Sequence, residues 1–519
     1  MAESSLKSPD NTLWRLVELR AAATPERVMF VDERERSITF GGFKARSERV
    51  AQGLLDLGVE PGSTVSWQLS SRIETLLLKT ALSRLDVLQV PVLPLYRDRE
   101  VGFLLNETKP GFVFLPGVLK GFDHVGMVKR LTADMNPQPK IVVTYDELPE
   151  APVRALPPAP MDNDRERWIF ATSGTTSEPK GVVHSDRSML AASLALGEAL
   201  HYSDKDVSTV NFPLAHGGGL IVLMDALIYG MKGVLTESFA PAAAVELYRR
   251  HGVTLAGTGT AFYLAYLAEQ RRQPGVPIIP TLRLMHGGGA PKPPPIYHQV
   301  KSELGVKIAH GYGMTEGLLL AQNPPGGSDE QLANSDGVPV TGAQFRIVRA
   351  DGSPAAIGED GEILVRGPML FKRYTRPELT AKAVDKEGFY RTGDYGHLRA
   401  DGHITVSGRL KDVIIRKGEN ISAQEIENVL HRHPKIAEVA VIGLPDDTRG
   451  ERACAVVVSK GDMRITLGEM AAACEEAGLA RFKVPEQLEF VAELPRNSTM
   501  KVLKTRLREV FAKKPWKST

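Results

Sequence analysis

The sequence of 519 residues lacks the features that mark a membrane-spanning or secreted protein. No apolar run reaches the roughly 18 residues that a spanning helix needs. The longest candidate, residues 220–229, is short and contains Asp225. The amino terminus has no apolar core of the kind found in signal peptides. We therefore expect a cytoplasmic protein without a membrane span.

The sequence also has few cysteines and a small net charge. Cys454 and Cys474 are the two cysteines and have no metal-like spacing, so we expect free thiols in a reducing compartment. The formal net charge is +2, which gives no global field for nucleic acid or an anionic membrane. With 42% hydrophobic and 24% charged residues the composition is that of a globular protein, and the length predicts more than one domain.

The order of apolar patterns predicts an α/β fold. Up to about residue 410, short runs rich in Val, Ile and Leu alternate with longer helical patterns, which is typical of βαβ units and largely parallel sheets. Within this region, Gly- and Asp-rich turns between residues 346 and 406 predict a β-rich subdomain. We expect a large N-terminal domain of layered βαβ sheets over residues 1–410.

The remaining residues, 411–519, have a different pattern. Ser422 and Glu425 have capping-box spacing and predict a helix through Leu430, and Thr466 and Glu469 predict a second helix. Apolar runs at residues 439–443 and 455–458 predict strands. We expect a small C-terminal α+β domain.

A loop rich in hydroxyl groups, Thr172 to Gly181, follows the predicted strand 167–171, and we expect a helix to begin near Ser185. Backbone N–H groups and hydroxyls in such a loop can surround an anion, and Lys180 adds positive charge for a polyphosphate. The spacing is not that of a Walker loop, and an ordinary surface loop is the alternative. The candidate phosphate-binding residues are Thr172, Ser173, Gly174, Thr175, Thr176 and Lys180.

This loop resembles the signature loop of the adenylate-forming superfamily, which includes acyl-CoA synthetases, luciferases and peptide-synthetase adenylation domains. Ser177 stands where the family commonly has glycine, and we expect this small hydroxyl residue to be tolerated. The resemblance implies ATP and Mg²⁺ as cofactors and a small domain that is mobile.

Further segments resemble the family's motifs in the family's order. The resemblance implies that Tyr312 stacks on adenine, Thr315 contacts phosphate and Glu316 is a catalytic residue that holds Mg²⁺. Taken alone, Tyr312 is equally compatible with a core position and Glu316 with a helix start. The other nucleotide-side residues implied here are Gly288, Gly289, Ala290, Pro291, Gly311, Gly313 and Met314.

Later segments of the chain complete the nucleotide site that the family implies. Asp394 would bind the ribose hydroxyls, and Arg409 would reach the nucleotide. Lys411 occupies the hinge position, with a solvated lysine as the alternative. Lys501 matches the catalytic lysine that stabilises charge in the adenylation step, with Thr172 as a further catalytic residue. Met500 replaces the glycine that usually precedes this lysine.

The segment around His216 resembles acyl-CoA ligases rather than amino-acid-activating domains, which carry an aspartate there. A structural histidine beside a glycine turn is the alternative. Residues 90–100 and 213–216 look most like cyclohexanecarboxylate-type ligases. We expect a hydrophobic medium-chain or cyclic acid in a pocket that includes His216, Thr258, Gly259, Thr260, Phe262 and Met314.

Residues 416–421 resemble the ligases' loop along the pantetheine tunnel, which assigns Gly418 and Glu419 to coenzyme A. No carrier domain follows Lys501, so we expect transfer to free CoA. The partners are then a small carboxylic acid, ATP and CoA, without nucleic acid. The alternatives are an adenylating enzyme that loads a separate acyl carrier protein and a non-catalytic nucleotide-binding protein.

Overall fold

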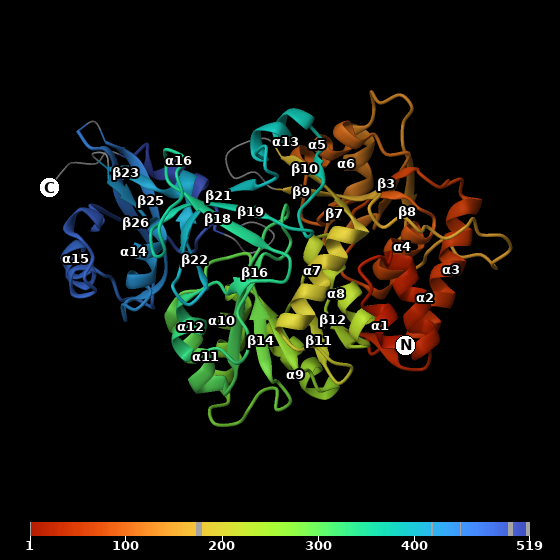
Figure 1. Ribbon diagram of the computed structural model, residues 1–519, viewed down its shortest axis with the longest axis horizontal. Helices are drawn as coiled ribbons and strands as arrows, with labels where there is room; N and C mark the ends of the chain where they lie inside the picture. Colours follow the sequence, from red (N-terminus) through yellow and green to blue (C-terminus); the bar gives the residue numbers. More distant parts are fainter. Residues whose placement is uncertain (1, 173–178, 417–418, 447, 497–501, 515–519) are drawn as a thin grey trace.

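The computed structural model describes residues 2–172, 179–416, 419–446, 448–496 and 502–514 (Figure 1). In Figure 1 the chain runs from the red amino terminus, through two sheets and a central β-rich subdomain, to a blue carboxyl-terminal domain at the opposite end. A large N-terminal domain and a small C-terminal one, predicted from the sequence, are both present.

The first sheet has the strand order β20-β10-β9-β4-β3-β5-β8. Neighbours from β9 to β8 are parallel, whereas β10 and β20 pair antiparallel at one edge. Strand and helix alternate along this region as predicted. The strands are β3 (Thr64–Trp67), β4 (Leu88–Pro91), β5 (Phe112–Leu115), β8 (Lys140–Val143), β9 (Glu166–Thr172), β10 (Lys180–Ser185) and β20 (Arg373–Tyr374). The intervening elements are α4 (Ile73–Arg84), α5 (Asp98–Thr108), α6 (His124–Leu131) and the hairpin of β6 (Val118–Leu119) and β7 (Phe122–Asp123).

The second sheet has the order β17-β16-β15-β14-β13-β11-β12-β1-β2 and is parallel from β15 to β1. Its strands are β1 (Val28–Asp32), β2 (Ser37–Thr39), β11 (Val207–Val210), β12 (Lys232–Leu235), β13 (Leu255–Thr258), β14 (Leu284–Gly287), β15 (Lys307–Tyr312), β16 (Ala321–Gln322) and β17 (Val338–Pro339). The other helices of this domain are α1 (Ala2–Leu6), α2 (Leu13–Ala23), α3 (Phe40–Asp56), α7 (Asp186–Ala199), α8 (Gly217–Tyr229), α9 (Pro241–His251), α10 (Thr260–Arg272), α11 (Pro294–Leu304) and α12 (Asp329–Asn334).

Helices α7 and α8 lie between the two sheets (Figure 1). One apolar core joins Trp168 of the first sheet, Leu190 and Leu223 of these helices and Val210 of the second sheet. Helix α8 is apolar on almost all sides, as expected of a helix inside a protein core. None of the described helices is long and apolar enough to cross a membrane.

The β-rich subdomain is an antiparallel sheet of β18 (Gln344–Val348), β19 (Gly361–Arg366), β21 (Tyr390–Leu398) and β22 (Ile404–Arg409), with α13 (Pro377–Ala383) beside it. This confirms the predicted β-rich region over residues 346–406, and the sheet begins and ends a few residues beyond those bounds.

The C-terminal domain has its own sheet, β24-β23-β26-β25, with β27 beside β26, and its own apolar core. Its elements are η1 (Leu410–Asp412), β23 (Ile414–Arg416), β24 (Glu419–Ile421), α14 (Ala423–Leu430), β25 (Ile436–Asp446), β26 (Gly450–Ser459), α15 (Leu467–Glu476), η2 (Arg481–Lys483), β27 (Gln487–Phe490) and α16 (Lys504–Phe511). The predicted strands and both helix starts are confirmed. Cys454 and Cys474 are free and buried.

The two predicted capping boxes differ in detail. Thr466 and Glu469 form the reciprocal pair that the sequence predicts. Ser422 caps its helix by accepting from the Glu425 N–H, whereas the Glu425 carboxylate accepts from Lys483.

One local prediction is wrong. Residues 172–181 were expected to be loop up to the helix near Ser185, but Lys180 and Gly181 already belong to β10, which precedes α7. Val182 and Val183 are fully buried, and β10 pairs antiparallel with β9. Burial of this short apolar run therefore favours a strand, and β9 and β10 form a hairpin. Residues 173–178 lie outside the described part of the chain.

Candidate active site

A cavity of about 1250 Å³ lies where the second sheet meets the β-rich subdomain and the C-terminal domain. Its wall includes the carboxyl ends of β13, β14 and β15, the usual position of ligands in open parallel sheets. The predicted residues that line it are Thr172, Lys180, His216, Thr258, Gly259, Thr260, Phe262, Gly288, Gly289, Ala290, Pro291, Gly311, Tyr312, Gly313, Met314, Thr315, Glu316, Asp394, Arg409 and Lys411. Segments far apart in the sequence thus meet in one space.

Several predicted residues lie outside the part of the chain that the structure describes. They are Ser173, Gly174, Thr175, Thr176, Ser177, Gly418, Met500 and Lys501. Glu419 lies in β24, opposite Arg416 of β23. Thr172 and Lys180 face each other across β9 and β10, at the base of the hairpin that carries the predicted phosphate loop.

A buried carboxylate, Asp394, lies at the predicted nucleotide end of the cavity. Its Oδ2 accepts a 2.7 Å hydrogen bond from the Tyr312 hydroxyl, and its Oδ1 lies 3.0 Å from Nε of Arg409. Asp394 and Arg409 are register partners on β21 and β22, so the sheet itself places carboxylate and guanidinium together. This end presents a carboxylate acceptor, a cation and an aromatic ring within one small region.

Two glycines beside this group are required by geometry. A Cβ at Gly288 would lie 2.5 Å from the Gly311 carbonyl oxygen, so these two backbones approach too closely for a side chain. Gly289 has φ +78°, a conformation that side chains disfavour, and space next to its Cα position is open. The predicted adenine-side loop is therefore held by backbone packing as well as by its place on the cavity wall.

Glu316 lies between the nucleotide end and the hairpin. It is 9% exposed, and its Oε1 accepts a 2.8 Å hydrogen bond from the Tyr374 hydroxyl. The Tyr390 hydroxyl lies 3.2 Å from that of Tyr374, and the Lys180 ammonium lies 4.9 Å from the Tyr374 ring centre. A single buried carboxylate fits Mg²⁺, which keeps water ligands and takes others from substrate phosphates. Tyr374, which donates to Glu316, was not predicted, because an isolated tyrosine carries no motif.

The C-terminal domain closes one side of the cavity. Burial, followed by the charge of Arg409, lowers the pKa of Lys411, which lies in the η1 turn. Next to it, Asp412 accepts a 2.7 Å hydrogen bond from Arg508 of α16. The Ser422 hydroxyl donates to the Ser407 carbonyl of β22, so a direct hydrogen bond joins the two domains across the segment that contains Lys411.

His216 lines the cavity on the side where we predict the acyl pocket. Its Nδ1 accepts a 3.2 Å hydrogen bond from the Gly218 N–H and so caps helix α8. Its ring stands edge-on to Phe212, with centroids 4.7 Å apart. Burial lowers its pKa to about 4, so the imidazole is neutral near pH 7. His216 is therefore both a helix cap and part of the cavity wall, which combines the two readings of the sequence.

Thr258 has an unusual backbone on the same side. Its φ is +111°, and its buried Oγ1 has no hydrogen-bond partner among the described residues. Strained backbone of this kind costs about 1–3 kcal/mol and gathers at functional sites. Its neighbour Thr260 donates a 2.6 Å hydrogen bond to the Pro291 carbonyl, which ties the acyl and nucleotide sides together.

Three polar residues of the acyl side were missed by sequence reasoning: Tyr202, Asp225 and His286 all line the cavity. In the sequence, Asp225 stands out only as a charged residue within the apolar run 220–229. That same position, a carboxyl inside an otherwise apolar helix, is the signal that points to it.

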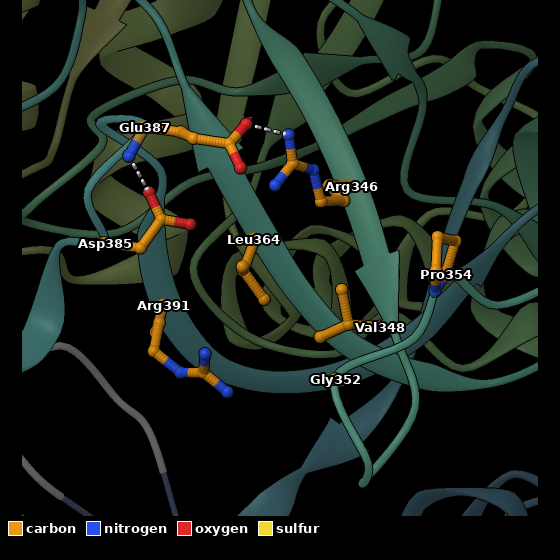
Figure 2. A pocket seen from close by; sticks show the side chains of 8 residues that line it. All are labelled: Arg346, Val348, Gly352, Pro354, Leu364, Asp385, Glu387 and Arg391. Atoms are coloured by element: carbon orange, nitrogen blue, oxygen red, sulfur yellow. Dashed lines mark hydrogen bonds and ion pairs between the residues drawn. The ribbon is translucent and has the colours of Figure 1, made fainter.

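A separate hollow of about 400 Å³ lies on the β-rich subdomain (Figure 2). Glu387 there accepts a 2.6 Å hydrogen bond from Arg346, and its N–H donates to Asp385. None of the predicted site residues lines this hollow. Its charged side chains lie outside the main cavity, so they provide positions for control substitutions.

Comparison with known proteins agrees with this geometry. The chain matches the AMP-binding enzyme family over residues 17–375 and its C-terminal domain family over residues 425–501. It is 30% identical to the medium-chain fatty-acid–CoA ligase of Escherichia coli, over 94% of this chain and 88% of that protein. It is 31% identical to the salicyl-AMP ligase / salicyl-S-ArCP synthetase of Mycobacterium tuberculosis, over 95% and 89%.

A solved structure is similar over the whole length. This is the o-succinylbenzoate CoA synthetase of Bacillus subtilis in complex with its acyl-adenylate intermediate, with TM-score 0.84, 29% identity and coverage of 98% of this chain and 99% of that one. The predicted superfamily is confirmed: the chain belongs to the AMP-binding, adenylate-forming enzymes and is an AMP-forming acid–thiol ligase.

Proposed function

We propose that this enzyme joins a hydrophobic carboxylic acid to coenzyme A in two steps, using ATP and Mg²⁺. The observation that carries the proposal is one cavity whose wall includes Asp394, Arg409 and Glu316 as well as His216, Thr258 and several apolar side chains. Relatives named as CoA ligases support the thiol acceptor. We retain the prediction that the reaction takes place in the cytoplasm.

In the first step the acid is adenylated. A carboxylate oxygen of the acid attacks the α-phosphorus of ATP, and pyrophosphate leaves with its electron pair. Asp394 accepts hydrogen bonds from the ribose hydroxyls, and Tyr312 offers its ring to adenine. Glu316 would hold Mg²⁺, which would supply positive charge against the phosphates, and Lys501 stabilises the charge that develops on the transferring group.

In the second step the CoA thiolate attacks the carbonyl carbon of the mixed anhydride, and AMP leaves. We infer that residues 411–519 turn about Lys411 between the two steps, exchanging Lys501 for the segment with Gly418 and Glu419. The position of Lys411 in a short turn between β22 and β23 supports this role. The turn would break the hydrogen bond between Ser422 and Ser407.

The substrate is a medium-chain or cyclic acid. Its recess is bordered by the apolar side chains of Leu196, Phe212, Ile221 and Val222. Burial of alkyl surface against them supplies affinity of roughly 25 cal/mol per Å².

The test is a panel of straight-chain, cyclic and aromatic acids with ATP and Mg²⁺, each with and without CoA. Pyrophosphate and acyl-CoA are both measured. We expect at least one acid to give the thioester, and Lys501→Ala to lower pyrophosphate release by about 10²–10³-fold. Glu387→Gln, in the separate hollow, is the matched control and should retain activity.

Pyrophosphate release without thioester would instead favour an adenylating enzyme that loads a carrier protein, as the salicyl-AMP relative's printed name describes. Binding of ATP with no acid activated across the panel would overturn catalysis altogether.

A further inference from the structure

We propose that the acyl pocket ends in a polar subsite, formed by Asp225, Tyr202 and His286, which binds an uncharged hydrogen-bonding group at the far end of the substrate. A hydroxyl, carbonyl or ether oxygen on the tail or ring of the acid is the chemical class that it fits. The inference rests on the proposed function and refines the substrate from a simple hydrocarbon acid to an oxygenated one.

One face of helix α8 forms a wall of the pocket. Gly218, Ile221, Val222 and Asp225 all line the cavity, with the i, i+3, i+4, i+7 spacing of a single helical stripe. The rise from the first to the last is about 10 Å. His216 caps the start of this helix, so Asp225 lies about two helical turns farther along an otherwise apolar wall.

Asp225 is a costly residue at this depth. It is 3% exposed, and its Oδ1 accepts from the Ser193 hydroxyl of α7. Among the described residues no cation forms an ion pair with it, and burial raises its pKa to about 8. The carboxyl is therefore protonated near pH 7, and a neutral carboxyl both donates and accepts a hydrogen bond.

Tyr202 and His286 line the same cavity, and Asp225 lies close enough to Tyr202 to add, after burial, to the rise in the pKa of its hydroxyl. The Tyr202 hydroxyl lies 3.4 Å from Nε2 of His286, and the two rings stand edge-on with centroids 6.0 Å apart. Burial lowers the pKa of His286 to about 4 and raises the pKa of Tyr202. Both side chains are therefore neutral in the working pH range.

Arg283 and Asp206 both act electrostatically on Tyr202 and His286, and they form an ion pair with each other. Arg283 binds Asp206 through two hydrogen bonds of 2.7 and 3.0 Å, so neither is left to pair with a charged substrate group. A carboxylate or ammonium at the tail of the acid would lose its hydration with no opposite charge in return. An uncharged oxygen would instead meet three neutral hydrogen-bonding side chains.

A purely structural role for Asp225 makes a different prediction. If the carboxyl only joined α8 to α7 through Ser193, its replacement would change stability without altering the choice of acid. The subsite requires that the choice of acid changes.

The experiment compares matched acids with the intact wild-type enzyme. Octanoate is paired with ω-hydroxyoctanoate and with octanedioate, and cyclohexanecarboxylate with its ring-hydroxylated form; kcat/KM is measured for each. We expect the hydroxylated member of at least one pair to exceed its parent by about 10-fold or more, and the diacid to be the poorest. Asp225→Leu should reverse the preference, whereas Asp225→Asn, which still donates and accepts, should keep it.

Equal or better use of the unsubstituted acids by the wild type would overturn the subsite while leaving the ligase proposal intact. Equal losses for both members of a pair in Asp225→Leu would also overturn it. Failure of every acid to release pyrophosphate would refute the proposed function, and the subsite with it. The ratios of kcat/KM between paired acids are measured in the wild type and need no variant. They therefore test the inference even if Asp225→Leu folds poorly.

Discussion

Two aspartates at opposite ends of the cavity are almost equally buried and yet differ in chemistry. Asp394 is 4% exposed and Asp225 is 3% exposed. Asp394 contacts the Arg409 guanidinium and the Tyr312 hydroxyl, whereas Asp225 has the Ser193 hydroxyl as its described partner. The two carboxyls are therefore alike in their burial and differ in the partners that surround them.

Under the proposed function, the difference follows what each end of the cavity would bind. Ribose hydroxyls are donors and suit an anion that a cation supports. At Asp225 no cation among the described residues forms an ion pair, and burial raises its pKa to about 8, so this carboxyl retains a proton near pH 7 and is a neutral group of mixed donor and acceptor character.

The strongest way to break this comparison is Asp394→Ala. The change removes two charge-assisted hydrogen bonds, each worth about 1.5–3 kcal/mol, so kcat/KM for ATP should fall by about 10²–10⁴-fold. Steady-state pyrophosphate release with ATP varied is the measurement. Glu387→Gln also removes an acidic charge from the β-rich subdomain, but outside the cavity, and should change the value less than about 2-fold. Similar losses in both variants would mean that the effect is one of folding.

The protonation of Asp225 can be tested through stability. Its pKa is raised in the folded protein, so the native state holds a proton that the unfolded chain releases. Its stabilising contribution is complete below about pH 4 and is lost as pH rises toward about 8. Relative to that of Asp225→Asn, the free energy of unfolding of the wild type should fall by at most about 1.4 kcal/mol for each unit by which the pH rises between about pH 5 and 7. Urea unfolding of both proteins across this range measures it.

Parallel unfolding curves for the wild type and Asp225→Asn would show that Asp225 is already ionised when folded. The comparison with Asp394 would then lose its basis.

The smallest effects should come from the two hydroxyl donors. Tyr312→Phe removes the donor to Asp394 and should raise KM for ATP by about 5–10-fold, since such a bond contributes about 1 kcal/mol. Ser193→Ala removes the donor to Asp225 and should lower the free energy of unfolding by about 1–2 kcal/mol with KM for ATP unchanged. Each variant serves as the other's control. A rise in KM for ATP in Ser193→Ala would mean that the two ends are coupled.

The nucleotide end was largely predictable because its residues lie in short contiguous motifs. Tyr312 and Glu316 belong to one segment, and Asp394 and Arg409 to two neighbouring strands. Because the nucleotide is the same ligand throughout the family, it requires the same few groups at the same spacing. The pattern can therefore be recognised in a single sequence. The β10 strand was missed because a glycine-rich loop and a helix start adjoin its few apolar residues.

The acyl end was predictable only in part. His216 and Thr258 were expected in the pocket, but Ser193, Tyr202 and His286 each look like an ordinary core residue in the linear sequence. They come from α7, the loop after it and β14, and no local pattern connects them.

By itself the sequence determined the α/β architecture, the two-domain order and the adenylate-forming family. Periodicity and motif spacing are local properties of a chain, so they survive without coordinates. Tertiary structure alone decided which side chains share the cavity and whether a buried carboxyl meets a cation or only a hydroxyl. Electrostatic character depends on distance and solvent access, and the folded packing of α7, α8 and the sheet ends sets both.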